Sequence, residues 1–105
     1  DGRNTPMRLT QEQIDSIRQV TREEAGPEAV VRVFGSRLND EVKGGDLDLL
    51  VELPGPIEHP AVLAATLSAR ISRTLYGRKV DVVLLAPNLE RLPIHDVALS
   101  QGQVI

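Results

Sequence analysis

The chain has 105 residues, enough for one domain and too few for two. Its formal net charge of −3 argues against a broad electrostatic grip on nucleic acid or on an anionic membrane, and its only aromatic residues, Phe34 and Tyr76, argue against a base-stacking platform. The absence of cysteine excludes disulfides, thiolate catalysis and zinc–thiolate sites, and it fits a cytoplasmic location.

Residues 7–105 are expected to form the single domain. Met7 is interpreted as a native start, and residues 1–6 as an added or disordered remnant that takes no part in the fold. No apolar stretch reaches the roughly 18 residues of a membrane span, so no membrane contact is expected.

The first predicted elements are a helix and a strand. Residues 9–26 predict a helix with one apolar face, and Thr10 with Gln13 forms the sequence pattern of a capping box. The β-branched run 29–35 predicts a strand that ends at its glycine. Residues 36–42 have the composition of one or two helical turns, and a Gly-Gly turn follows them.

The second half of the chain continues the alternation of predicted helices and strands. It predicts a strand, the longest helix, a third strand and a last short helix, over residues 46–53, 59–77, 79–85 and 92–102. The full order indicates an α/β (α+β) fold, a small mixed β-sheet with helices packed on one side.

Two aspartates stand at the head of the second predicted strand. A strand places residues i and i+2 on one face, about 7 Å apart, so Asp46 and Asp48 point the same way. Asp81 lies early in the third predicted strand and joins them if the two strands are neighbours. Each aspartate alone could equally be a solvated charge at a strand end. Together, three carboxylates suit two Mg²⁺ ions, or Mn²⁺, in the arrangement used for in-line phosphoryl transfer.

A candidate phosphate site precedes these aspartates. Gly35 and Ser36 follow the first predicted strand, at a possible helix N-terminus whose N–H groups and dipole would favour a phosphate. Arg37 and Lys43 could neutralise further phosphate charge. An ordinary capped turn is the plain alternative for Gly-Ser alone, and no Gly-Lys-Ser/Thr follows, so this is not a Walker P-loop.

Taken together, these segments resemble a known family. GSRLNDEVKGGDLDLLVE, followed later by VDVVLL, resembles the minimal nucleotidyltransferases (MNT) of the DNA polymerase β superfamily, whose signature is Gly-Ser, Asp-x-Asp after a short gap, and a third Asp on a later strand. The closing LPIHDVALSQGQVI resembles the last helix of the family. The resemblance covers residues 10–105 and implies a polymerase β-like nucleotidyltransferase core.

The resemblance also implies a reaction and its residues. Asp46 and Asp48 would ligate both Mg²⁺ ions, and Asp81 would join them at the catalytic metal and help to activate the acceptor hydroxyl. Gly35 and Ser36 would hold the β- and γ-phosphates of ATP or another nucleoside triphosphate. The reaction would transfer a nucleoside monophosphate, AMP from ATP, to a hydroxyl, with pyrophosphate leaving.

Many free-standing members of this size are paired with a small helical HEPN toxin and act as its antitoxin, by direct binding or by adenylylating it. The resemblance therefore implies a HEPN-type protein partner, and either this partner or a second copy of the chain would complete the cleft. Asn39 stands where many members carry a second arginine, and Val104-Ile105 replaces their Leu-Tyr. The alternative interpretation is therefore a catalytically weak or inactive module that neutralises a partner by direct binding.

Other candidate residues have ordinary interpretations. His59 and His95 have no ligand-spaced partner, so both are expected to cap helices or lie on the surface. Arg70 and Arg73 fall one turn apart on the longest predicted helix. The plain interpretation of this pair is a solvated face, and the functional one is a contact with phosphate or with a partner.

Overall fold

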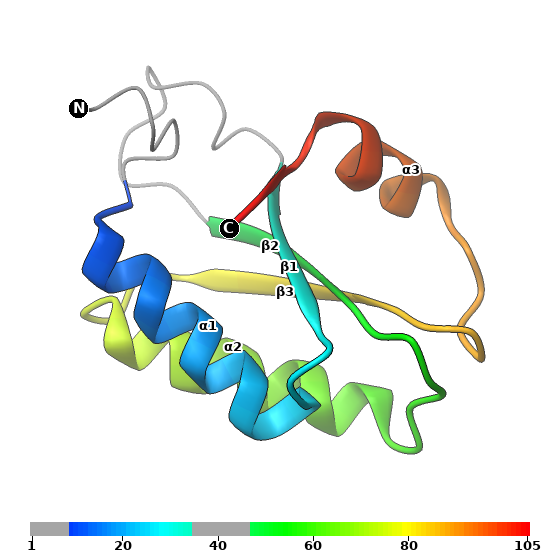
Figure 1. Ribbon diagram of the computed structural model, residues 1–105, viewed down its shortest axis with the longest axis horizontal. Coiled ribbons are helices and arrows are strands. Elements are labelled where there is room, and N and C mark those ends of the chain that lie inside the picture. Colours follow the sequence, from blue (N-terminus) through cyan, green and yellow to red (C-terminus); the bar gives the residue numbers. More distant parts are fainter. Residues whose placement is uncertain (1–8, 35–46) are drawn as a thin grey trace.

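The computed structural model describes residues 9–34 and 47–105 (Figure 1). The predicted helical turns over 36–42 lie outside the described residues. In chain order the elements are α1 Gln11–Ala25, β1 Val30–Phe34, β2 Leu47–Glu52, α2 Pro60–Thr74, β3 Val80–Leu85, α3 Pro93–Gln101 and β4 Gln103–Val104. Every predicted helix and strand within the described residues is confirmed, and β4 is an addition.

The strands form one mixed sheet in the order β3-β2-β1-β4. β1 pairs antiparallel with both β2 and β4, whereas β2 and β3 are parallel. The parallel pair is joined through α2, the crossover that such a pair requires. The predicted small mixed α/β sheet is therefore confirmed.

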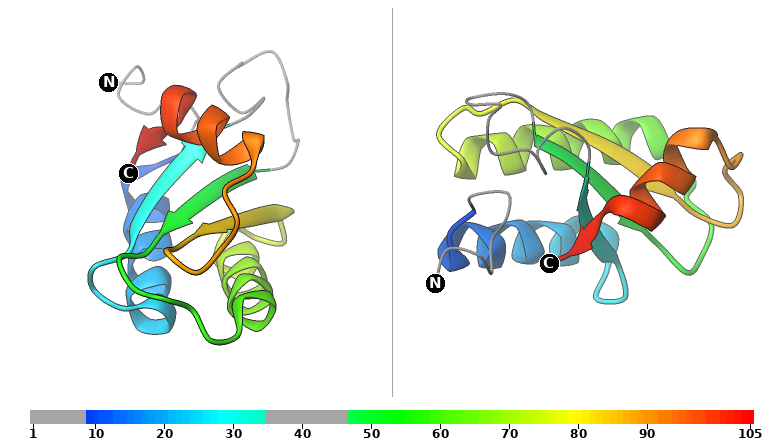
Figure 2. Two further views of the ribbon diagram at one scale, coloured as in Figure 1. Left: turned by 90° about the vertical axis from the view of Figure 1, so that its right-hand side faces the viewer. Right: turned by 90° about the horizontal axis from the view of Figure 1, so that it is seen from above.

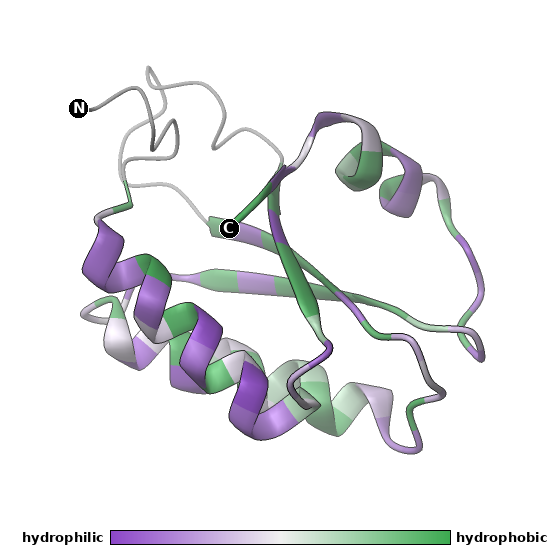
Figure 3. Ribbon diagram, viewed as in Figure 1, coloured by the Kyte–Doolittle hydropathy of each residue, from purple (hydrophilic) through white to green (hydrophobic). Residues whose placement is uncertain are grey.

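The main core lies between the sheet and the two long helices. The left view of Figure 2 shows α1 and α2 together on one face of the sheet. Alternate residues of β2 point into this core, and Figure 3 shows the matching alternation of apolar and polar bands along α1. The fully buried side chains of this cluster include Ile17, Val33, Leu49, Leu67 and Ile71.

α3 lies on the opposite face of the sheet (Figure 2), so the prediction of helices on one side holds only for α1 and α2. The physical reason is that each of the two central strands carries one large apolar side chain on its second face, among the charged residues there. Phe34 and Leu50 point away from the main core and are buried in a second cluster with Ala98 of α3. These two apolar side chains need cover from water on that face, which α3 provides.

The helix ends follow their sequence signals. Thr10 Oγ1 accepts a hydrogen bond from the Gln13 N–H, and Gln13 Oε1 accepts one from the Thr10 N–H, both at 3.0 Å, which confirms the capping box. At the C-terminus of α2 the chain turns through Tyr76 and Gly77, with φ of 62° and 85°. No described helix is both long and apolar enough to cross a membrane.

Candidate functional site

Two of the predicted carboxylates lie on adjacent strands in matching positions. Asp48 of β2 is the register partner of Asp81 of β3, in a parallel pairing. Register partners on neighbouring strands are about 4.8 Å apart at the backbone and direct their side chains to the same face. The condition that strands 46–53 and 79–85 are neighbours is met, and it brings Asp81 beside Asp48. Whether Asp46 joins them lies outside the described residues.

Both carboxylates face away from α1 and α2. Leu47 and Leu49 flank Asp48 and are buried in the main core. Val80, which precedes Asp81, is buried there too. Because side chains alternate along a strand, the two aspartates occupy the other face. Asp48 is half-buried and Asp81 is exposed, so this corner of the sheet surface is polar and open.

Three strand ends meet at this corner. β1 runs antiparallel to β2, and its last residue, Phe34, is the register partner of Asp48. Gly35 and Ser36 are the next residues of the chain after Phe34. The structure thus brings the end of β1 to the beginnings of β2 and β3. The other predicted site residues, Gly35, Ser36, Arg37, Lys43 and Asp46, lie outside the described residues.

The chemistry of this carboxylate pair fits a hard divalent cation. Like charges directly across two strands repel, and a cation reverses the sign of that interaction. Within residues 9–34 and 47–105 no group of three metal-ligating side chains occurs, and the third predicted ligand, Asp46, lies outside these ranges. Among the described residues the side chain of Asp81 makes no hydrogen bond or ion pair. An all-oxygen donor set of this kind suits Mg²⁺ or Mn²⁺ rather than zinc.

His95 holds α3 against the same face of the sheet. Its side chain is buried, its Nδ1 accepts from the Leu92 N–H at 2.8 Å, and its Nε2 lies 2.9 Å from the Leu84 carbonyl oxygen of β3. Since Nδ1 is an acceptor, the ring proton is on Nε2, which donates to that carbonyl. The predicted capping role is confirmed, but the contact with β3 was not predicted because it joins residues distant along the chain.

Arg70 is an ion-pair residue between the two long helices. Its Nη2 lies 2.8 Å from Glu23 Oε1 and its Nη1 lies 2.7 Å from Glu24 Oε2. The hydrogen bond from Arg70, with a second from Gln19, holds the pKa of the Glu23 carboxyl below its ordinary value. Arg70 is therefore engaged on the α1–α2 side and does not lie on the carboxylate face. Arg70 therefore forms a solvated ion pair, which is close to the solvated face that the sequence predicted for it.

Comparisons with solved structures show the same fold. A chain in the crystal structure of the toxin–antitoxin MntA–HepT matches with a TM-score of 0.61 and 18% identity, over 90% of this chain and 70% of that one. A chain in a toxin–antitoxin structure with AMP-PNP matches with a TM-score of 0.64 and 17% identity, over 91% and 72%. At sequence identities this low, the likeness shows a shared fold and nothing more.

The sequence itself carries a family match. No curated protein sequence matches the chain. The nucleotidyltransferase domain family, by contrast, matches residues 14–104, a range that contains α1 to β4 and both register-paired aspartates. The chain belongs to the nucleotidyltransferase domain family.

Proposed function

We propose that this protein is a Mg²⁺-dependent nucleotidyltransferase that transfers AMP from ATP to a hydroxyl of a helical HEPN-type partner protein, as the antitoxin of a toxin–antitoxin pair. The observation that carries the proposal is the register pairing of Asp48 with Asp81 on the open face of the sheet. The family match and the fold shared with chains of toxin–antitoxin complexes support it.

The proposed roles follow from position along the chain. Asp46, Asp48 and Asp81 would hold two Mg²⁺ ions, or Mn²⁺, and Asp81 would also orient the acceptor hydroxyl. Bound Mg²⁺ would polarise the phosphoryl oxygens and stabilise the charge that develops on them. On the same face, Arg32 Nη1 lies 2.6 Å from Glu52 Oε1. This ion pair lies further along β1 and β2 than the position where Phe34 and Asp48 pair.

The phosphates would be held at the end of β1. Gly35 and Ser36, which follow Phe34 beside Asp48, would donate to the β- and γ-phosphates, with Arg37 and Lys43 adding positive charge. In the transfer, the acceptor oxygen bonds to the α-phosphorus, the bond from that phosphorus to the bridging oxygen breaks, and pyrophosphate leaves. The acceptor hydroxyl releases its proton to the solvent or to a carboxylate.

The test is transfer of label from ATP carrying a radioactive α-phosphate. The protein and its proposed HEPN-type partner are incubated with Mg²⁺, and the label on each chain is measured. We expect the partner to be labelled, and we expect Asp48→Asn and Asp81→Asn each to reduce the initial rate by about 100-fold or more. Asp15→Asn is the matched control, because Asp15 is a surface residue of α1 whose carboxylate accepts a hydrogen bond from Gln11.

The same variants separate catalysis from binding. If Asp48→Asn neutralises the toxin as well as the unaltered protein does while label transfer is lost, the catalytic antitoxin proposal fails. The direct-binding alternative would then stand. If no label reaches the partner from the unaltered protein under any divalent cation, the nucleotidyltransferase activity itself is rejected.

A further inference from the structure

Lys79 lies on the same face of the sheet as the carboxylate pair. Its carbonyl oxygen accepts a hydrogen bond from the Leu47 N–H at 3.0 Å, so the parallel pairing of β2 with β3 extends back to this residue. Val80 is buried in the main core, whereas Lys79 and Asp81 on either side of it are exposed. Because side chains alternate along an extended strand, Lys79 and Asp81 project from one face, about 7 Å apart.

The turn that carries Lys79 is bonded to α2 on both sides of this residue. Before it, the Gly77 N–H donates to the Ser72 carbonyl oxygen at 2.9 Å. After it, the Ser68 hydroxyl donates to the Val80 carbonyl oxygen, which joins α2 to the first residue of β3. Together with the bond to β2, these contacts set the position of the Lys79 backbone beside the carboxylates.

The charge of this turn is positive. Between Leu75 and Asp81 the chain carries Arg78 and Lys79 and no acidic residue. Within the part of the chain that the structure describes, the side chain of Asp81 makes no ion pair, so Lys79 does not neutralise its neighbour on the same face. An ammonium group therefore lies beside the carboxylate pair without cancelling its charge.

The order of the strands places Lys79 on the side of the site from which the acceptor would come. In the proposed transfer the β- and γ-phosphates lie at the end of β1, and β2 separates β1 from β3. In an in-line displacement the attacking oxygen approaches the phosphorus opposite the departing pyrophosphate. With pyrophosphate at β1, the acceptor hydroxyl approaches from the side of β3, where Asp81 would orient it and Lys79 is the next residue on the same face.

We propose, on the basis of the function proposed above, that Lys79 contacts an acidic side chain of the acceptor polypeptide beside the hydroxyl that receives AMP. The acceptor is then a hydroxyl-bearing segment that carries carboxylates. An ammonium group whose backbone lies about 7 Å along the strand from Asp81 meets a neighbour of the reacting hydroxyl rather than the hydroxyl itself. Lys79 would therefore affect binding of the acceptor more than the rate of the transfer.

The test measures label transfer from ATP carrying a radioactive α-phosphate, at varied concentrations of the proposed HEPN-type partner and of ATP. We expect Lys79→Glu to raise KM for the partner by about fivefold or more, with kcat and KM for ATP within about twofold of the unaltered protein. Lys79→Arg should restore KM for the partner, because it keeps the charge. Hexaglutamate, which has no side-chain hydroxyl, should compete with the partner and should inhibit Lys79→Glu more weakly.

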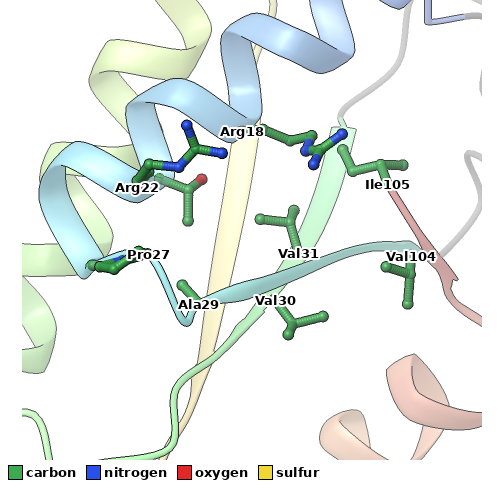
Figure 4. Close-up of a pocket in the computed structure, with 10 residues that line it drawn as sticks. Arg18, Arg22, Pro27, Ala29, Val30, Val31, Val104 and Ile105 are labelled. Carbon is green, nitrogen blue, oxygen red and sulfur yellow. The ribbon is translucent and has the colours of Figure 1, made fainter.

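The matched control is Arg18→Glu, the same reversal of charge on the other face of the sheet. Arg18 extends from α1 and lines a hollow together with residues of β1 and with residues 104–105 (Figure 4). α1 covers the face opposite the carboxylate pair, so this substitution changes the net charge without changing the surface beside Asp81. KM for the partner should stay within about twofold of the unaltered protein.

The outcomes separate this proposal from the proposed function. If the unaltered protein transfers no label, the proposed function fails and the role of Lys79 fails with it. If the unaltered protein labels the partner but Lys79→Glu leaves KM for the partner unchanged, only the role of Lys79 is overturned. A larger effect on KM for ATP would assign Lys79 to the triphosphate, and equal effects of Lys79→Glu and Arg18→Glu would show a general effect of charge. Either result would also overturn the proposal.

Discussion

Asp48 and Asp81 are register partners on two parallel strands, and both face away from the long helices. In each strand, the residues next to these aspartates are apolar and pack into the main core. Two carboxylates directly across from one another weaken a sheet by repulsion, by about 0.2–1 kcal/mol in the absence of a counter-charge. We therefore expect the role of this carboxylate pair to be the binding of a positively charged ligand.

The first prediction concerns thermal unfolding with and without ligand. The two variants compared are Asp48→Asn and Asp81→Asn. Without divalent cation, Asp81→Asn should unfold at the same temperature as the unaltered protein or slightly above it, because one of two repelling charges is removed. With Mg²⁺ and ATP, the unaltered protein should gain thermal stability by mass action, and the two variants should not. Calorimetry of the three proteins and of the Asp15→Asn control checks this. Equal stabilisation of all four would contradict it.

Local patterns were enough to predict much of this fold. The capping box of Thr10 and Gln13 and the β-branched runs of the strands are encoded by neighbouring residues, and the structure has them where the patterns indicate. The pairing of strands 46–53 and 79–85 was a condition of the sequence argument rather than a prediction. The helix between them is long enough for the crossover that a parallel pair requires, and the structure shows that the two strands do pair.

Features that depend on tertiary contacts were beyond the sequence. β4 has only two residues, too few for a periodicity, and exists because β1 offers an edge. Burial of α3 on the second face depends on Phe34 and Leu50 lying side by side in space. The partners of Arg70 belong to another helix, so spacing along α2 could not reveal them.

The second prediction is the pH dependence of the Glu23–Arg70 pair. The pKa of Glu23 is lowered in the folded protein, chiefly by the hydrogen bond from Arg70, so the pair stabilises the fold above the ordinary carboxyl value of 4.5. This stabilisation is lost as the pH falls through the lowered pKa. Arg70→Gln should therefore reduce the free energy of unfolding at neutral pH and have progressively less effect in acid. Urea unfolding across this pH range measures it, with Arg73→Gln as the control.

A constant difference between Arg70→Gln and the unaltered protein from neutral to acid pH would contradict this assignment. It would mean that Arg70 stabilises the α1–α2 contact by packing of its alkyl chain rather than through the charge of Glu23.

The third prediction concerns a glycine at the end of α3. A Cβ at Gly102 would lie 2.3 Å from the Ala98 carbonyl oxygen and 3.2 Å from the Val33 carbonyl oxygen, both backbone atoms. Gly102→Ala should therefore destabilise the protein by about 1–3 kcal/mol through a forced backbone shift. Gly55→Ala, where a Cβ meets nothing within 4 Å, should stay within about 0.5 kcal/mol. Urea unfolding of both variants measures the difference, and equal effects would show that the turn into β4 is pliable.

The fourth prediction concerns the buried histidine. His95→Phe keeps a ring of similar shape but leaves the Leu84 carbonyl and the Leu92 N–H without their partner. We expect a loss of about 1–3 kcal/mol of stability. His59→Phe is the control, because 72% of its side chain is exposed, and its effect should be small. Chemical unfolding compares the two, and a neutral His95→Phe would show that α3 is held by its apolar contacts alone.

The central claim is that Asp48 and Asp81 belong to a divalent-cation site. The most direct measurement is paramagnetic broadening of backbone amide signals during titration with Mn²⁺, which requires neither nucleotide nor partner. We expect amides around Asp48 and Asp81 to broaden first, at substoichiometric Mn²⁺, and Mg²⁺ to restore them. We also expect Asp48→Asn to remove this local effect. Broadening centred elsewhere, or uniform loss of signal unaffected by Asp48→Asn, would contradict it.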